Sequence, residues 1–233
     1  MINAILPREH TNHEYEAELR RLRDQLLLMG AKVEEIIGCS IRALVDRDGA
    51  LAERMIAADR KVNQLEIEVD ELCMQVLARR QPVASDLRFL TTALKLVTDL
   101  ERIGDIGVNI CERVLELNAE PPLKRYVDLP NMASEVQEML HEALDAFVAA
   151  DVEAAQRVIA RDQNIDAYYM QIFRELLTYM MEDPRNISRA IRLQSIGKHL
   201  ERIGDHATNL GELVVFMVKG KDIRHLGKLA DDS

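Results

Sequence analysis

The sequence of 233 residues is poor in cysteine and in aromatic side chains, with three cysteines, five tyrosines, four phenylalanines and no tryptophan. Cys39, Cys73 and Cys111 are spaced far apart and odd in number, which fits neither a disulfide framework nor a CxxC metal site. We therefore expect reduced and mostly buried thiols. Basic residues are also fewer than acidic ones, with 30 Lys and Arg against 40 Asp and Glu, and no basic block occurs. This balance excludes the cationic surface that nucleic-acid binding requires.

Long hydrophobic runs and common catalytic motifs are missing as well. The longest apolar run, from Leu213 to Val218, is much shorter than the roughly 20 residues that span a bilayer. Residues 1–15 lack the hydrophobic core of an export signal, so we expect a cytoplasmic protein. The patterns GxxxxGKS/T, GxSxG and HExxH do not occur. We therefore expect a protein that is not an enzyme.

The composition that remains is suited to helices. Hydrophobic residues make up 48% of the chain and charged residues 30%, with abundant Leu, Ala, Glu and Arg. Proline, which breaks helix interiors, occurs only at positions 7, 82, 121, 122, 130 and 184. We predict six helices, at about residues 13–46, 49–80, 85–118, 131–149, 151–182 and 185–218. Asp48 and Asp151 are the expected N-caps of the second and fifth helices, and Ser85 or Asp86 that of the third.

An internal repeat divides these helices into two sets of three. The sequence LERIGD occurs from Leu100 to Asp105 and again from Leu200 to Asp205, at an offset of 100. Upstream, residues 45–59 and 148–162 share seven identities at an offset of 103. Two repeats in the same order indicate a duplication. We predict an all-α fold of two tandem antiparallel three-helix bundles, at residues 13–118 and 131–218, joined by a linker at 119–130.

Each copy carries an acidic stripe on its third helix. At 100° per residue, the stripe positions lie on one side of the helix: Glu101, Asp105 and Asn109 in the first copy, and Glu201, Asp205 and Asn209 in the second. The second helix of each copy adds further oxygen ligands, namely Asp59, Asn63, Glu66 and Asp70 in the first and Asp162 and Asp166 in the second. Like charges at this spacing repel each other unless a cation compensates them. Oxygen atoms converging from two helices suit Mg²⁺, Mn²⁺, Ca²⁺ or iron better than zinc.

Two other interpretations of the stripes stay open. They can be solvated faces of an acidic protein that hold no ion. They can also belong to a carboxylate-bundle oxidase or iron-storage protein, which requires two Glu-x-x-His elements, whereas the sequence has one, from Glu138 to His141. The two copies also differ, because Tyr169 and Phe173 stand where the first copy has acidic residues. The two sites need not be equivalent.

At these motifs the sequence resembles the PhoU family, the bacterial regulators of phosphate uptake and signalling. The most specific parts are QPVASDLRFLTTALKLVTDLERIGDIGVNI at 81–110 and GKHLERIGDHATNLGE at 197–212. The resemblance implies metal clusters of Fe, Mn, Mg or Zn on E/DxxxD motifs, here Glu101 with Asp105, Glu201 with Asp205, and Asp162 with Asp166. In the first copy the corresponding pair is Asp59 with Asn63, which has one carboxylate fewer.

The resemblance also implies a function. Members of the family are cytoplasmic, often homodimeric, and restrain the phosphate-starvation response by linking a phosphate ABC transporter to a membrane sensor histidine kinase. Association with the membrane would then be peripheral and through these partners. Arg88, in the DLR segment, is the candidate partner-binding residue. The alternatives from other classes are the metal-dependent oxidase or iron-storage bundle and a metal-free structural adaptor.

Overall fold

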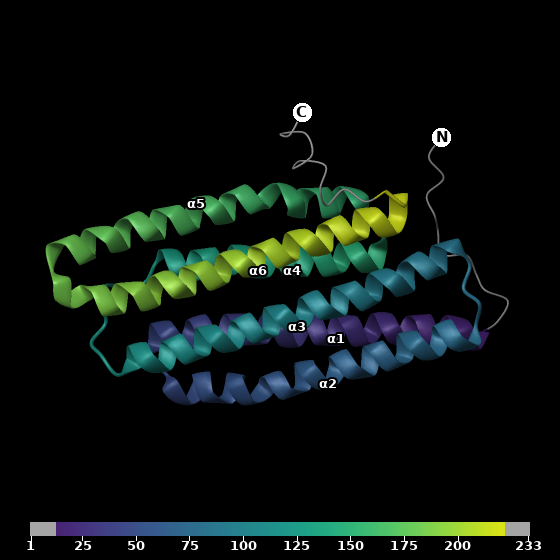
Figure 1. Cartoon of the computed structure of the whole chain (residues 1–233), viewed down its shortest axis with the longest axis horizontal. Coiled ribbons are helices and arrows are strands. Elements are labelled where there is room, and N and C mark those ends of the chain that lie inside the picture. Colours follow the sequence, from purple (N-terminus) through teal and green to yellow (C-terminus); the bar gives the residue numbers. More distant parts are fainter. Residues whose placement is uncertain (1–12, 222–233) are drawn as a thin grey trace.

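The computed structural model describes residues 13–221, in which helices are joined by short connections and no strand occurs (Figure 1). It contains six α-helices and one 3₁₀ turn, η1, at Pro184–Asn186. The helices are α1 (His13–Asp46), α2 (Gly49–Arg79), α3 (Ala84–Asn118), α4 (Asp128–Ala149), α5 (Val152–Glu182) and α6 (Ile187–Lys219). The predicted all-α class and the six predicted helices are confirmed. None of these helices is long and apolar enough to span a membrane.

One predicted boundary is wrong by three residues. The fourth helix begins at Asp128 rather than at residue 131, so Pro130 lies in its first turn and the connection after α3 is shorter than the predicted linker at 119–130. Proline is tolerated there because the first amides of a helix have no partner within the helix. A helix can therefore begin before a proline, and Pro130 does not mark the first residue of α4.

The N-caps follow the prediction for two of three helices. Asp48 accepts a hydrogen bond of 2.9 Å from the amide of Leu51, and Asp151 accepts two from the first turn of α5. The third helix instead starts at Ala84 without a side-chain cap, and Asp86 accepts a hydrogen bond from the Tyr15 hydroxyl at 3.0 Å. Asp86 thus links the N-terminal ends of α1 and α3.

The duplication is visible in the backbone. Arg47 and Ala150, which directly follow α1 and α4 at equivalent positions, both adopt the left-handed conformation, with φ of 57° and 53°. In each half the three helices are joined by short turns, so the first and third run parallel and the second antiparallel (Figure 1). Tyr15 with Asp86 near one end, and Arg47 with the Asn118 carbonyl near the other, show this register for α1 and α3.

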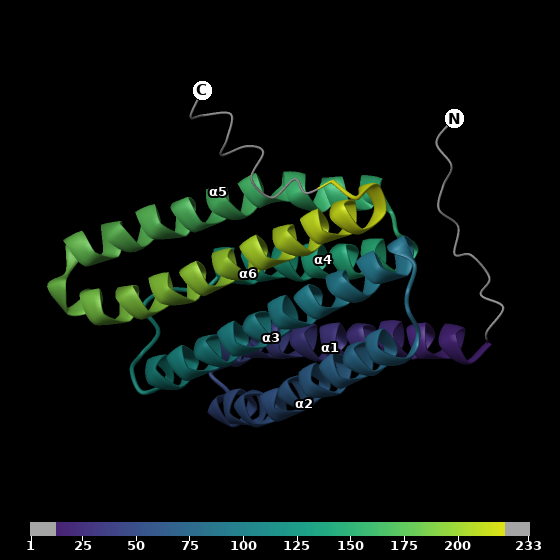
Figure 2. The ribbon, with the colours of Figure 1, turned by 45° about the vertical axis from the view of Figure 1, so that its right-hand side comes forward.

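The two halves lie side by side and share one hydrophobic core (Figure 2). Helix α3 packs against α6, and α1 packs against α4. The helices approach closely at Gly30 of α1, where a Cβ would collide with the Leu144 side chain of α4. Phe89 of α3 stacks on Phe147 of α4, with ring centroids 5.4 Å apart. Side chains from both halves therefore fill the space between them.

The thiols lie as expected. Cys73 and Cys111 are buried, Cys39 is half-buried, and all three are free. Burial raises the pKa of the Cys73 and Cys111 thiols to about 12, which keeps them protonated at neutral pH.

Candidate functional site

Helices α2 and α3 bring five acidic residues together on one side of the first half. This first carboxylate cluster consists of Asp59, Glu66 and Asp70 from α2 and Glu101 and Asp105 from α3. Spacings of four and seven residues, one and two helical turns, place the members from each helix on one face. The predicted stripe on α3 and the acidic face of α2 thus meet each other, as the sequence suggested.

Repulsion and burial act together in this cluster. The pKa of Glu101 is raised by burial first and then by Asp105, Glu66 and Asp59. The pKa of Glu66 is raised by burial and by its neighbours Asp70 and Asp105. Glu101 and Glu66 therefore hold their negative charge less readily than in water, because water has been withdrawn and like charges are close.

Asp59 is the most buried member, with 8% of its surface exposed. Its Oδ2 accepts a hydrogen bond of 3.1 Å from Asn63 Nδ2, whereas its Oδ1 is buried without a hydrogen-bond partner. Burial, followed by the charge of Asp105, raises the pKa of Asp59. Gly104 makes room for this oxygen, since a Cβ there would lie 3.1 Å from Oδ1. A buried acceptor without a donor is costly for the protein and favours a bound cation.

The second carboxylate cluster contains Asp162 and Asp166 from α5 and Glu201 and Asp205 from α6. Partial burial raises the pKa of Asp162 and of Asp205, and the neighbouring carboxylates add to both shifts. As Asn63 does for Asp59 in the first cluster, a neighbouring side chain donates to a carboxylate here, whereas Glu201 Oε2 is buried without a hydrogen-bond partner. Thr208 Oγ1 donates to Asp162 Oδ1 at 3.1 Å.

Lys198 provides a positive charge at the second cluster. Its Nζ lies 2.5 Å from Glu201 Oε1 and 5.4 Å from the centroid of the Tyr169 ring. The same ammonium group opposes the rise in the pKa of Asp205. Tyr169 is fixed in turn by Gln194, whose Nε2 donates to its hydroxyl at 2.7 Å. The sequence analysis missed Lys198 and Thr208, although the i,i+3 spacing of Lys198 and Glu201 was a readable signal.

The two predicted asparagine ligands lie one turn beyond the carboxylates. Asn109 and Asn209 are half-buried on α3 and α6, four residues after Asp105 and Asp205. In the described part of the chain they make no hydrogen bond to either cluster. Their role as ligands stays a prediction.

The donor chemistry of the clusters suits a hard cation, because all the converging atoms are oxygens. As the side chains stand, however, no three His, Cys, Asp or Glu residues within 13–221 are grouped so that they could hold a metal ion. Binding of a cation would therefore require carboxylate side chains to rotate toward one another.

Arg88, the predicted partner-binding residue, has a role within the chain. Its Nε donates to the Met217 carbonyl of α6 at 3.0 Å, which satisfies one of the last backbone oxygens of that helix. This contact ties the N-terminal part of α3 to the C-terminal end of α6. A role in binding a partner stays a prediction.

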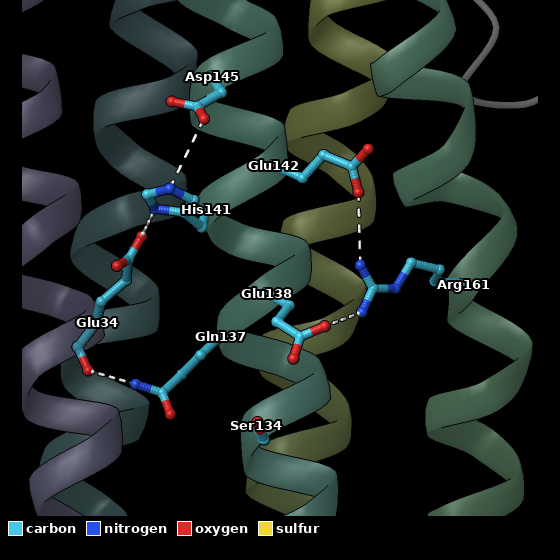
Figure 3. Close-up of a pocket in the computed structure, with 8 residues that line it drawn as sticks. All are labelled: Glu34, Ser134, Gln137, Glu138, His141, Glu142, Asp145 and Arg161. Atoms are coloured by element: carbon cyan, nitrogen blue, oxygen red, sulfur yellow. Dashed lines mark hydrogen bonds and ion pairs between the residues drawn. The ribbon is translucent and has the colours of Figure 1, made fainter.

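A second polar feature was not anticipated as a site. A hollow of about 530 Å³ lies between α1, α4 and α5, lined by eight polar or charged side chains of which four are acidic (Figure 3). Arg161 of α5 pairs there with Glu135, Glu138 and Glu142 of α4, and His141 Nδ1 lies 3.2 Å from Glu34 Oε1 of α1. Glu138 and His141, the one Glu-x-x-His element, therefore lie on an outer surface, where Glu138 pairs with Arg161 and His141 contacts Glu34.

The fold and the clusters define a class of protein: a duplicated, elongated helical bundle with a carboxylate cluster on the same face of each half. The model of the PhoU domain matches the chain twice, over residues 26–114 and 129–214, one match in each half. The chain belongs to the PhoU family.

Curated relatives align over almost the whole chain. It is 44% identical over 228 residues to the phosphate-specific transport system accessory protein PhoU homolog of Pseudomonas aeruginosa, covering 97% of this chain and 94% of the relative. It is 38% identical over 219 residues to the phosphate-specific transport system accessory protein PhoU of Escherichia coli K12, covering 94% and 91%.

Solved structures agree with the fold. The crystal structure of PhoU from Pseudomonas aeruginosa superposes with a TM-score of 0.85 at 45% identity, covering 89% of this chain and all of the other. The phosphate transport system regulatory protein PhoU from Streptococcus pneumoniae gives a TM-score of 0.82 at 29% identity, covering 90% and 99%.

Proposed function

We propose that this chain is an accessory protein of a phosphate-specific transport system, and that it acts as a cytoplasmic, non-catalytic regulatory adaptor. It restrains phosphate uptake and the phosphate-starvation response by linking a phosphate ABC transporter to a sensor histidine kinase. The observation that carries the proposal is the collinear match to accessory proteins of this name over 97% of the chain, with a PhoU domain in each half.

The shape and charge of the molecule support an adaptor. Helices of 31 to 35 residues, as in α2 and α3, give continuous faces of roughly 45–50 Å along which two partners can bind at once. A formal net charge of −10 favours association with basic surfaces and speeds the encounter with them. The homodimer and the identities of the transporter and the kinase rest on the family resemblance.

The carboxylate clusters form the cation-binding part of the proposal. Glu101 with Asp105 and Glu201 with Asp205 are the central residues, supported by Asp59, Asp162 and Asp166. Raised pKa values and the unpartnered Oδ1 of Asp59 support a cation, because bound positive charge would relieve both. When bound, a metal ion would crosslink the second and third helices of a half.

The function is tested in a strain that lacks the chain and carries a phosphate-starvation reporter. We expect high reporter activity in phosphate-rich medium, and restoration of repression by a plasmid copy. Affinity purification of the complementing copy should recover the ATPase subunit of the transporter. A reporter that stays low without the chain, together with unchanged phosphate uptake, would contradict the regulatory role.

A metal-free structural adaptor is the second candidate. It is favoured by the lack of a ready group of three metal-binding side chains within residues 13–221. In that case alanine at Glu101, Asp105, Glu201 and Asp205 would leave repression intact, and only changes on the partner-binding faces would abolish it.

An oxidase or iron-storage function has less support. Glu138 and His141 are engaged by Arg161 and Glu34 on an outer surface, and inward-facing Glu-x-x-His pairs are what such bundles use. Multiple-turnover oxidation of Fe²⁺ by the purified protein would revive that alternative.

A further inference from the structure

We propose that the seam between α3 and α6 holds a binding site for a phosphate group, with Arg102 and Arg202 on its two sides and His199 as a donor between them. The site lies where the two halves meet, because α3 belongs to the first half and α6 to the second. The inference goes beyond the proposed adaptor role and does not depend on a bound cation.

Helices α3 and α6 pack against each other in opposite directions (Figure 1). Arg88, close to the start of α3, binds the Met217 carbonyl near the end of α6. In the middle of both helices, Asp99 Oδ1 lies 2.8 Å from His206 Nδ1. The contact between Asp99 and His206 therefore defines which residues of the two helices lie at the same level.

Arg102 and Arg202 meet at one level of this seam. They hold the same position in the two LERIGD repeats, three residues after Asp99 on α3 and four residues before His206 on α6. At 100° per residue, each arginine lies within about 60° of the residue of its own helix that makes this contact. Both side chains are exposed, and neither makes a hydrogen bond or ion pair with another described residue.

The two arginines do not pair with the carboxylates beside them. Asp105 and Asp205 each follow their arginine by three residues, a spacing at which other side chains of α3 and α6 form ion pairs. Within residues 13–221 no such pair forms for Arg102 or Arg202. Both guanidinium groups are therefore available to an anion, which would form charge-assisted hydrogen bonds with them.

His199 supplies an unused hydrogen-bonding atom at the same seam. Its Nε2 lies 3.4 Å from Ser195 Oγ, whereas its Nδ1 is buried without a hydrogen-bond partner. Burial first, and then Arg202 and Arg113, lowers the pKa of His199, so two guanidinium groups lie near the ring. When Ser195 donates to Nε2, Nδ1 carries the hydrogen and needs an acceptor. An anion would supply that acceptor.

The internal repeat shows why His199 has no partner. His199 corresponds to Asp99 of the first copy, and His206 corresponds to Ile106. Asp99 and His206 satisfy each other across the seam, but the symmetry-related position opposite His199 is Ile106, which has no acceptor in its side chain. The protein thus provides its own carboxylate at one of the two equivalent positions and none at the other.

A phosphate group matches these donors in shape and charge. Arginine binds phosphate through two parallel N–H bonds, and phosphate has enough oxygen atoms to accept from two guanidinium groups and an imidazole together. Such a ligand would bridge α3 and α6 and so join the two halves. Inorganic phosphate and the phosphate of a nucleotide share this chemistry.

The test is equilibrium dialysis of the full chain with radiolabelled inorganic phosphate. The protein is treated with chelator and desalted first, so that phosphate held through a metal ion at the carboxylate clusters is not counted. We expect saturable binding, and the double variant Arg102→Gln, Arg202→Gln should lower the affinity at least about tenfold. Arg174→Gln, at an exposed arginine of α5 that also has no partner within residues 13–221, should leave binding unchanged.

Two substitutions of His199 test the site without removing an arginine. His199→Asp installs the residue of the first copy, so its carboxylate would take the place of the anion, and we expect no measurable binding. His199→Asn is neutral and keeps a side-chain N–H, so it should retain more affinity than His199→Asp. Circular dichroism and thermal unfolding verify that each variant keeps its helices.

Competition identifies the source of the phosphate group. Unlabelled inorganic phosphate and adenosine monophosphate are compared at constant ionic strength, and displacement by either one, lost in the arginine variant, supports the site. The competitor that acts at the lower concentration is assigned as the ligand.

Three results would overturn the inference. They are no saturable binding of either compound by the wild type, unchanged affinity in the double arginine variant, and equal displacement by chloride at the same ionic strength. The adaptor role would stand in each case, because the reporter strain tests it separately.

Discussion

A Cβ placed on Gly107 of α3 would lie 2.6 Å from Cγ2 of Ile36 on α1. The two parallel helices of the first half therefore pack backbone against side chain at this point. Cγ2 is attached directly to the branched Cβ of Ile36 and has little freedom to move away.

Gly107→Ala should therefore destabilise the protein, although alanine is the better helix former. Replacement of glycine in a helix gains about 1 kcal/mol, and overpacking this rigid contact costs about 2–3 kcal/mol, the upper part of the usual range. We expect a net loss of about 1–2 kcal/mol in chemical denaturation. Gly49→Ala, where the added Cβ meets Leu115 at an ordinary 3.4 Å, serves as the control and should not be destabilised. Equal stability of Gly107→Ala and the wild type would show that α1 and α3 separate easily.

Neutralising Asp59 should stabilise the chelated protein at neutral pH. Asparagine keeps the shape and the oxygen that accepts from Asn63, but it removes a buried charge next to Asp105. We expect a gain on the order of 1 kcal/mol, seen as a higher Tm in the presence of chelator. Asp145→Asn, at an exposed position of α4, should change Tm little. A lower Tm for Asp59→Asn would contradict this prediction, because it would mean that the negative charge of Asp59 stabilises the folded protein.

The Arg161 pairs should make α4 and α5 depend on pH. Arg161 lowers the pKa of Glu135, so this pair stabilises the folded state above the ordinary pKa of glutamate, about 4.3, and the contribution is lost as pH falls through the lowered value. Arg161→Ala should cost about 1 kcal/mol at pH 7, because the side chain is mostly buried and also binds Glu138 and Glu142.

The check is urea unfolding of wild type and Arg161→Ala between pH 7 and pH 3.5. The difference in unfolding free energy should hold constant down to about pH 5 and shrink below it. Arg157→Ala, which removes a more exposed arginine that pairs with Glu142, should have a smaller effect at every pH. If the difference in unfolding free energy between the two proteins grew as the pH fell, the predicted role of the Arg161 pairs would be wrong.

Phe147→Ala should weaken both halves together. Phe147 is 2% exposed and stacks on Phe89, which belongs to the other half. Truncation of a buried phenylalanine costs about 3–5 kcal/mol. Because the core is shared, we expect one cooperative transition at lower denaturant in calorimetry and circular dichroism. Met181→Ala, at a side chain that is 86% exposed, should change stability by less than about 0.5 kcal/mol. Two separate transitions in the Phe147→Ala variant would argue for independent halves.

Much of the fold was predictable because its signals are local or repeated. The LERIGD repeat, the capping residues Asp48 and Asp151 and the spacing of the prolines defined six helices in two sets. The start of α4 was missed because Pro130 is allowed inside a first turn, so its position does not fix the boundary.

The site was predictable only in part. Residues on one helix, such as Glu101 and Asp105, follow from periodicity. The hydrogen bond from Thr208 to Asp162 joins residues 46 positions apart, and no local pattern specifies it. The contact between Arg88 and the Met217 carbonyl likewise depends on how α3 and α6 dock, which single-chain spacing does not encode. Contacts between helices could therefore be identified only from the three-dimensional structure.

The central claim, that these carboxylates hold a cation, is tested most directly by elemental analysis of untagged protein purified without chelator. The wild type and a variant with alanine at Glu101, Asp105, Glu201 and Asp205 are compared at equal purity and helicity. The account predicts stoichiometric Fe, Mn, Mg or Zn in the wild type and its loss in the variant. Equal trace amounts of metal in both proteins would contradict it.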